Sequence, residues 1–366
     1  MNQEAVGRGS VPVMTTSNAG ERPIRVGLAA FGMVSRVFHA PLIRATPGLE
    51  LAAVATSRPD EVGPQVPGAR LLPSPESLIT DPDIDLVVVT TPNDSHVRLA
   101  CAALDAGKHV VVEKPVALDA DEAEKLATAA AQARSRGLQA SVFHNRRWDG
   151  DFLTVLDAMD RGLVGRPVAF ESRFDRFRPQ VRDRWREKAG PGSGIWIDLG
   201  PHLVDQALQL FGRPAWVWGD IATVRDEAEA DDDFHVVLGY DRLRVVLGGT
   251  TLAGRPGPRF VLDGTEGTLV LEGLDPQEPQ LAAGTMPGDE GYGLGAADGT
   301  FTGADGESVV PRLRGGYEDF YARMRDAILG IDDVPVTVND AVAVMRIIDA
   351  ASRSSESGNR VVPAWI

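Results

Sequence analysis

The feature that most constrains this chain is a regular alternation of short apolar strands with helical segments between residues 24 and 144. The expected strands are IRVGLAA from Ile24, LELAAVAT (49–56), DLVVVTT (85–91), HVVVEKP (109–115) and LQASVFH (138–144). Helical patterns separate them from Gly32 onward, across SHVRLACAALDAG, and from about Asp119 to Arg136. Strands that are apolar throughout are typical of a parallel sheet covered by helices on both faces. The pattern therefore predicts a doubly wound α/β fold whose ligands bind beyond the carboxyl ends of the strands.

Beyond Asn145 the pattern changes to alternation with a period of two. A helix is expected near 150–161, then VAFESRFDRF, and then the strands WVWGDIATV, FHVVLGY, LRVVLGGT, RFVLDG and GTLVLEG. Asp and Gly turns join these strands, which predicts an antiparallel sheet. The acidic run 226–233 is expected to be a solvated loop, and residues 272–310 a long excursion. Two helices are expected at about 317–330 and 339–356.

The length and charge of the chain bound its organisation. With 366 residues it is too long for one ordinary core, so we expect domains at 23–145 and 146–366. The helix at 339–356 is a candidate to pack back on the first domain. A net charge of −15 argues against nucleic acid and anionic membrane surfaces as partners.

Several features predict a cytoplasmic protein. Cys101 is the one cysteine, so no internal disulfide can form and a reducing compartment is expected. Residues 1–22 are polar, lack the apolar stretch of a signal peptide and are expected to be a disordered tail. No segment approaches about 20 uninterrupted apolar residues.

A nucleotide fingerprint is expected where the first strand turns into a helix, in GLAAFGMVSRVFHAP. At the three glycine positions of G-x-G-x-x-G the chain has Ala30, Gly32 and Ser35, so the motif alone is a weak signal. The retained glycine allows the backbone to approach a pyrophosphate, and the following helix start offers free N–H groups. We expect Phe31, Gly32 and Met33 to contact the cofactor.

The end of the second strand bears on which nicotinamide cofactor is used. An NAD site usually places an acidic residue there to hold the ribose hydroxyls. Here the strand ends in Thr56-Ser57-Arg58, without an acid before Asp60. A hydroxyl and a guanidinium suit a 2′-phosphate, which favours NADP over NAD, with Ser57 and Arg58 as ligands. The alternative is an ordinary surface arginine.

Two stretches place chemically active side chains near the predicted edge. HVVVEKPVAL puts Glu113, Lys114 and Pro115 at a strand tip, although strands also end in charges and proline simply because they reach the surface. Further on, Asp198, His202 and Asp205 are spaced to share one helix face. Because Pro201 belongs in a first turn, Asp198 is expected just ahead of that helix. A helix cap with a satisfied histidine and a carboxylate–histidine metal site are the alternatives, and no metal is expected because no other His or Cys lies nearby.

Taken together, these stretches resemble the Gfo/Idh/MocA family of nicotinamide-dependent oxidoreductases. The resemblance rests on GLAAFGMVSRVFHAP, TTPNDSH (90–96), AGKHVVVEKP (106–115) and GSGIWIDLGPHLVDQ (192–206). HNRRWDGDF (144–152) and RWREKAGPGSG (184–194) are similar to the NADP-dependent scyllo-inositol dehydrogenase branch. The resemblance implies a Rossmann domain, a C-terminal α/β domain with a large open, mostly antiparallel sheet, and dimers or tetramers formed through that sheet. It also implies that Pro115 can follow a cis bond.

The resemblance further implies roles for individual residues. Lys114 would be the catalytic lysine, relaying a proton or stabilising an alkoxide, and the charge of oxidised nicotinamide would favour loss of its proton. His202 would bond the reacting hydroxyl, Asp198 would orient substrate or imidazole, and Asp205 would support His202 from behind. Further cofactor contacts are implied at Thr91, Pro92, Asn93, His96, Glu113, Trp185 and Arg186. A substrate wall is implied at Arg146, Trp148 and Asp149. Each of these could equally be an ordinary ion pair or core aromatic.

The implied function is hydride transfer between NADP(H) and a secondary alcohol or ketone of a cyclic polyol or sugar. A nicotinamide-dependent glycosidase of the same family is an alternative, and so is a regulator that senses NADP without catalysis. The expected partner is a small molecule, with neither nucleic acid nor membrane involved.

Overall fold

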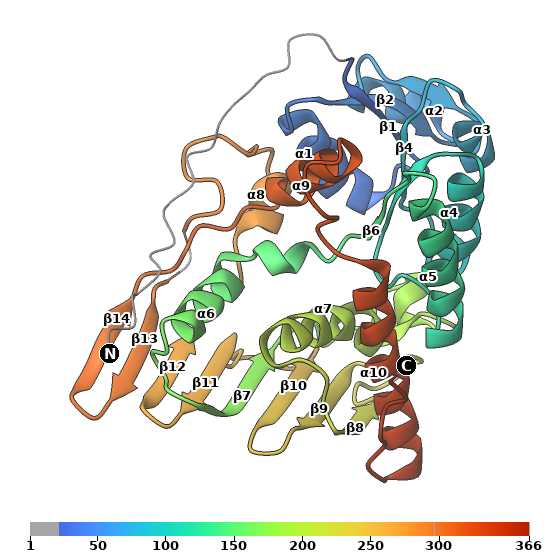
Figure 1. The fold of residues 1–366 in the computed structure, drawn as a ribbon. Helices are drawn as coiled ribbons and strands as arrows, with labels where there is room; N and C mark the ends of the chain where they lie inside the picture. Colours follow the sequence, from blue (N-terminus) through green and yellow to red (C-terminus); the bar gives the residue numbers. More distant parts are fainter. Residues whose placement is uncertain (1–21, 296, 366) are drawn as a thin grey trace.

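The structure, a computed structural model, describes residues 22–295 and 297–365 and has two layered domains (Figure 1). All but the last residue of the tail expected at 1–22 lies outside the described residues. Within the described residues no helix is long and apolar enough to cross a membrane.

The first domain is built on a parallel sheet whose strands run in the order β3-β2-β1-β4-β5-β6. The strands are β1 (Ile24–Leu28), β2 (Leu49–Ala55), β3 (Arg70–Leu72), β4 (Leu86–Val89), β5 (His109–Val112) and β6 (Ala140–Val142). The helices are α1 (Ala40–Ala45), α2 (Pro59–Val62), α3 (Pro75–Ile79), α4 (His96–Asp105) and α5 (Ala120–Arg134). The strand order reverses between β1 and β4, and a crevice for ligands opens at the carboxyl ends there. The predicted doubly wound sheet is therefore confirmed.

The short edge strand β3 was missing from the sequence-based expectation. Its three residues are exposed or half-buried, so they lack the continuous apolar signal that marks β4 and β5. It pairs with the end of β2, from Ala53 to Ala55.

The second domain contains an open sheet in the order β14-β13-β12-β11-β7-β10-β9-β8. The strands are β7 (Pro167–Arg173), β8 (Trp216–Ala222), β9 (Asp233–Gly239), β10 (Arg244–Thr250), β11 (Phe260–Gly264), β12 (Gly267–Leu271), β13 (Gly299–Gly303) and β14 (Gly306–Val310). β7 and β10 pair in parallel, and the other neighbouring strands pair antiparallel. The mostly antiparallel sheet predicted for this half is confirmed.

The long excursion predicted at residues 272–310 is wrong in part. This region holds α8 (Gln277–Ala282) and the hairpin of β13 and β14, which extends the sheet at one edge. The hairpin gave no alternating apolar signal because Gly306–Val309 is exposed and β13 consists of Gly, Thr and one Phe.

The helices of the second domain gather on one face of its sheet. In Figure 1, α6 (Gly150–Asp160) and α7 (Gly194–Phe211) lie between that sheet and the first domain. α9 (Glu318–Ile328) lies beside α1, and α10 (Val338–Ser357) packs against α5, α7 and β8. α10 is also bonded to α5 of the first domain: Asp349 accepts the Ala120 N–H at 2.9 Å, and Arg346 pairs with Glu124 at 2.6 Å.

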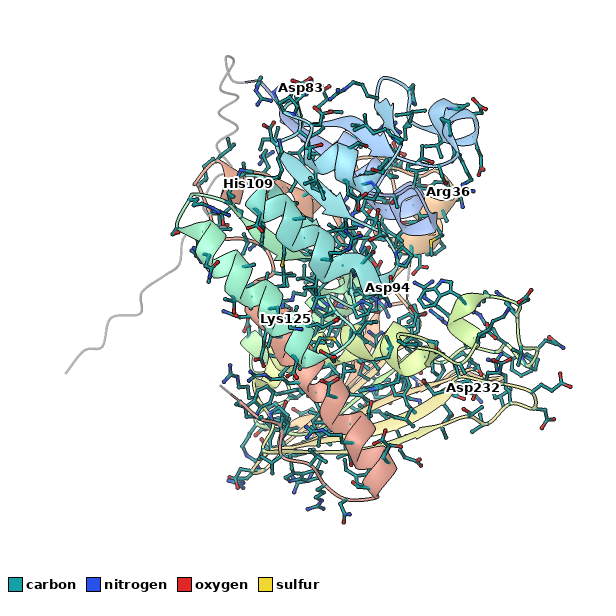
Figure 2. All side chains as sticks on the ribbon, turned by 90° about the vertical axis from the view of Figure 1, so that its right-hand side faces the viewer. Arg36, Asp83, Asp94, His109, Lys125 and Asp232 are labelled. Carbon is teal, nitrogen blue, oxygen red and sulfur yellow. The ribbon has the colours of Figure 1, made fainter. Side chains whose placement is uncertain are left out.

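The acidic run 226–233 is not the purely solvated loop that was expected. Asp232, labelled in Figure 2, is buried and accepts a 2.7 Å hydrogen bond from Arg225. The Asp231 carboxylate accepts the Trp196 N–H at 2.7 Å and so caps the first turn of α7. Two carboxylates of the run therefore serve as local structural partners.

Candidate active site

A cleft of about 190 Å³ lies where the carboxyl ends of β4 and β5 face α7. Figure 2 shows Asp94, just after β4, at the edge of the first domain that faces the second. The first domain lines the cleft with Thr90, Thr91, Asn93, His96, Glu113 and Lys114, and the second with Arg146, Arg176, Asp198 and His202. The switch point of the first sheet therefore opens onto side chains of both domains.

Lys114 occupies the tip of β5. The preceding strand residues, Val110–Val112, are fully buried, so the chain delivers the lysine from a rigid element. Its Nζ donates to the Asp198 carbonyl at 2.7 Å and to Asp198 Oδ1 at 3.2 Å. The Lys114–Pro115 peptide bond is cis.

The helix that carries Asp198 begins earlier than the sequence indicated. α7 starts at Gly194, so Asp198 lies inside the helix, and the prediction that it sits ahead of it is wrong. The early start has a tertiary cause, since the backbone N–H groups of Ile195 and Trp196 both donate to Asp231, which lies far along the chain. Pro201 lies in the helix interior, where its missing N–H removes one helical hydrogen bond.

The carboxylate of Asp198 lies among cations. Arg186 Nε is 3.6 Å from Oδ1, and Arg176 Nη1 is 3.9 Å from Oδ2. Burial opposes ionisation of Asp198, but the charges of Lys114, Arg186 and Arg176 outweigh it and lower its pKa to about 2. Asp198 is therefore ionised across the whole neutral range.

His202 faces the cleft one helical turn after Asp198. Burial, aided by the nearby charges of Lys114 and Arg146, holds the His202 pKa well below its ordinary value. Its Nδ1 has no hydrogen-bond partner among the described residues. A neutral imidazole in this position can accept a proton or a hydrogen bond from a bound hydroxyl.

Asp205 does not support His202, contrary to the prediction. Its carboxylate accepts two hydrogen bonds from Arg147, at 2.6 and 2.9 Å. Helical spacing places Asp205 near the face of α7 that carries His202. The Asp205 carboxylate nevertheless pairs with Arg147, which comes from another segment of the chain.

A buried chain of three side chains behind Lys114 was not foreseen. Tyr321 Oη lies 2.6 Å from His39 Nδ1, and His39 Nε2 lies 2.9 Å from Glu113 Oε1. Glu113 Oε2 accepts the Lys114 N–H at 2.9 Å. Burial opposes ionisation of Glu113, but the hydrogen bond and charge of His39 outweigh it and lower its pKa. Each oxygen of Glu113 thus has one partner within the protein, and Glu113 also lines the cleft.

The turn after β1 is held by side chains at the positions where glycines are missing. The hydroxyls of Ser35 and Thr90 both donate to the Ala30 carbonyl, at 2.8 and 3.0 Å. Nothing lies within 4 Å of the point where a Cβ on Gly32 would stand, so its backbone faces open space. Phe31 is buried and Met33 is exposed at the mouth of the cleft.

The other residues predicted to contact the cofactor differ in how far they are exposed to the cleft. His96 is buried, with Nδ1 at 2.8 Å from the Pro115 carbonyl and Nε2 at 2.8 Å from the Thr91 carbonyl. Thr91 and Asn93 line the cleft, and Pro92 is exposed beside them. Arg186 lines the cleft and stacks on Trp185, which is 47% exposed and outside the lining.

Ser57 and Arg58 are exposed after the end of β2. The Arg58 guanidinium pairs with Glu61 at 3.0 Å. Exposed ion pairs contribute little stability, so an anionic ligand can compete for this arginine.

Of the predicted substrate wall, Arg146 lines the cleft, but Trp148 and Asp149 do not. Trp148 is buried against Phe320, with ring centroids 5.8 Å apart. Asp149 is fully buried and accepts the Tyr317 hydroxyl at 2.6 Å. Both are corrections, because the stretch after β6 turns these two side chains inward and leaves Arg146 at the cleft.

The buried His144 leads to a prediction for acid stability. Burial lowers the pKa of His144. The charges of Arg147 and Lys114 lower it further, and the charge of Asp205 acts in the opposite direction. The unfolded chain takes up a proton near pH 6.5 and the folded chain only at a lower pH, so stability is lost as the pH falls from about 6.5 toward the lowered pKa of the folded state. We expect wild type to lose more stability than His144→Asn over this range, by at most about 1.4 kcal/mol per pH unit. Denaturant unfolding of both proteins over a pH series measures this, and parallel curves would contradict it.

Three comparisons place the chain among known proteins. The family description "Oxidoreductase family, NAD-binding Rossmann fold" matches residues 24–142, and "Oxidoreductase family, C-terminal alpha/beta domain" matches residues 157–363. In sequence the chain is 47% identical to the uncharacterized oxidoreductase YdgJ of Escherichia coli, covering 91% of this chain and 96% of that protein.

Two further relatives are informative. The chain is 36% identical to scyllo-inositol 2-dehydrogenase (NADP(+)) IolW of Bacillus subtilis, over 93% of this chain and 96% of that one. A solved structure from Klebsiella pneumoniae, described as an oxidoreductase, superposes with a TM-score of 0.88 at 43% identity, covering 94% and 96% of the two chains. Both halves of the chain, and not the Rossmann half alone, share this likeness. The chain therefore belongs to the Gfo/Idh/MocA family of oxidoreductases.

Proposed function

We propose that the protein transfers a hydride between NADP(H) and a secondary alcohol or ketone of a cyclic polyol or sugar. The observation that carries this proposal is the meeting of Lys114, Asp198 and His202 in one cleft at the switch point of the sheet. The similarity to a scyllo-inositol dehydrogenase supports a polyol or sugar as the substrate class.

The residues around the cleft fit a nicotinamide dinucleotide. The open space at Gly32 leaves room for a pyrophosphate at the start of the following helix. The exposed hydroxyl and guanidinium of Ser57 and Arg58 suit the 2′-phosphate of NADP. Thr91, Asn93 and His96 line the cleft together with Lys114, with Pro92 next to them in the chain, and these residues would contact the nicotinamide half.

When bound, the nicotinamide supplies or accepts the hydride. The protein must then handle the hydroxyl proton and the charge on the oxygen. Lys114 Nζ points its protons at Asp198 and can turn one of them to a substrate oxygen, stabilising a developing alkoxide. Neutral His202 accepts the hydrogen bond of the same hydroxyl and takes its proton in the direction of oxidation, and it returns the proton to the oxygen in the direction of reduction. Asp198, held ionised, fixes the ammonium of Lys114 in place.

Arg58→Ala tests the choice of cofactor. A bidentate guanidinium–phosphate contact is lost, so we expect the Kd of NADP to rise about tenfold or more while that of NAD stays nearly constant. Arg98→Ala is a matched control, since Arg98 is also exposed and paired with one carboxylate, Glu76, but lies on α4. Isothermal titration calorimetry with each cofactor measures both constants. An equal change for the two cofactors would contradict the assignment of Arg58.

The proposed function as a whole is tested by cofactor reduction over a panel of inositols and aldoses with NADP and NAD. Turnover that depends on NADP supports it. Tight binding of NADPH without turnover of any polyol or sugar would instead favour a sensing role.

We also propose that copies associate through the face of the second sheet that carries no helices in Figure 1. Light scattering on the purified chain measures the assembly, and a monomer at all concentrations would contradict it. With Cys101 as its one cysteine the protein needs no disulfide, and we propose that it works in the cytoplasm.

A further inference from the structure

The cleft wall is strongly positive although the chain as a whole carries a net charge of −15. The segment between β7 and α7 brings Arg176, Arg178, Arg184 and Arg186 to the lining, where Lys114 and Arg146 add two more cations. The carboxylates of the lining are Glu113, Asp198 and Glu278. Positive charge is thus concentrated at the place where the substrate is expected.

These carboxylates do not neutralise the arginines. Glu113 is engaged by His39 and the Lys114 N–H, and Glu278 pairs with Arg146 at 2.8 Å. Asp198 alone is shared by Lys114, Arg186 and Arg176, at 3.2, 3.6 and 3.9 Å. Arg178 makes no ion pair or side-chain hydrogen bond with any described residue. Arg184 pairs outside the lining with Glu187 at 2.7 Å. The cleft therefore holds one guanidinium without an anionic partner among the described residues, that of Arg178, and two that share the single carboxylate of Asp198 with Lys114.

Burial and neighbouring positive charges also destabilise the protonated forms of Arg176 and Arg178. Burial lowers the pKa of Arg176 to about 10. The charges of Arg178 and Arg146 act in the same direction, and the charge of Asp198 opposes them. Burial and the charges of Arg182 and Arg184 lower the pKa of Arg178. Cations that are destabilised in this way bind an incoming anion favourably.

The arginines are also held in place before any ligand binds. The backbone N–H groups of Arg176 and Arg178 donate to the carbonyls of Thr250 and Thr251, at 2.9 and 2.7 Å. The Arg176 guanidinium lies over the Phe174 ring, 5.0 Å from its centroid. A site prepared in this way loses little entropy on binding.

We propose that the substrate carries an anionic oxo group, a carboxylate or a phosphate, which Arg176 and Arg178 bind while its reacting hydroxyl lies at Lys114 and His202. This inference rests on the proposed function and narrows its substrate class to sugar or polyol acids and phosphate esters. The planar fork of a guanidinium matches both anions with two parallel hydrogen bonds.

The cofactor's own phosphates are the competing source of negative charge. They are expected at Gly32 and Arg58, which belong to the first domain. Arg176 and Arg178 belong to the second domain, and Arg176 lies against Asp198, beside the reacting groups. This placement favours the substrate as the origin of the anion.

Arg178→Met and Arg182→Met form a matched pair for the test. Both remove one arginine from the same segment, but Arg182 is exposed and outside the lining. The ligands are glucose, glucuronate and glucose 6-phosphate, and inositol with inositol monophosphate. We expect the anionic members to have the higher kcat/KM, and Arg178→Met to lower it about tenfold or more for them alone. Arg182→Met should behave as wild type.

Two outcomes overturn the inference while leaving the proposed function standing. In the first, neutral sugars are turned over best and Arg178→Met does not change the ratio of anionic to neutral rates. In the second, Arg178→Met weakens NADPH binding about tenfold, which would assign the arginine to the cofactor.

A binding measurement tests the inference separately, even if no sugar is turned over and the proposed function itself fails. Inorganic phosphate is titrated into the NADPH-saturated protein by calorimetry. We expect binding that weakens with added salt and is lost in Arg178→Met. Absence of binding, or equal binding by the variant, would overturn the inference.

Discussion

Replacing Lys114 by methionine is expected to lower kcat about 10³-fold while leaving the Kd of NADPH nearly unchanged. Methionine keeps the length and apolar stem of lysine but supplies neither a proton nor a positive charge. The cleft then lacks the group that donates to Asp198 and that we propose stabilises the reacting oxygen. Steady-state rates and fluorescence titration of NADPH separate the loss of chemistry from a loss of binding.

Lys125→Met is the control for removal of a lysine. Lys125 is exposed on α5 and labelled in Figure 2, and it lies outside the cleft. We expect its kcat to equal that of wild type. A Lys114→Met protein that retains more than about a tenth of the wild-type kcat would contradict the role of Lys114 in stabilising the alkoxide.

Arg259→Met is expected to cause the largest loss of stability, about 3–5 kcal/mol in the unfolding free energy of the second domain. The Arg259 side chain is fully buried, stacks 4.1 Å above the Phe260 ring, and lies 3.7 Å from the buried Asp151. It also donates to Ser172 and Gln206 at 2.8 and 2.7 Å. Without it, Asp151 remains in the core as an uncompensated charge. Chemical denaturation measures the change.

A second substitution identifies the cause of that loss. Arg259→Met combined with Asp151→Leu removes both charges, so we expect the double variant to regain most of the lost stability. Arg166→Met, at an exposed arginine, should change stability by less than about 0.5 kcal/mol. If the losses of the two core substitutions simply add, the pairing of Arg259 with Asp151 is not what stabilises this region.

Most of the fold could be predicted because its central strands carry a strong local signal. β4 and β5 are runs of buried valine, and the pattern of β8 to β12 alternates cleanly. The strands that were missed, β3 and the hairpin of β13 and β14, lie at the edges of their sheets, with β3 and β14 outermost. Edge strands bury few side chains, so their sequences show little periodicity.

The site was less predictable because its details depend on contacts between distant residues. Lys114 and His202 could be placed at the cleft from the strand tip and from helical spacing. The pairing of Asp205 with Arg147 and of Asp149 with Tyr317 could not, because each joins separate elements of the chain. The early start of α7 likewise depends on Asp231, more than thirty residues away.

The contact of His39 with Tyr321 has a consequence for the order in which the protein becomes complete during synthesis. A ribosome finishes residues 23–145 long before it adds α9. Until then His39 and Glu113 of the nascent Rossmann domain lack the hydroxyl of Tyr321, which contacts His39 in the complete protein. α10, with its contacts to Ala120 and Glu124, arrives later still. The group of side chains behind Lys114 is therefore completed only when Tyr321 is added, within about the last eighth of the polypeptide.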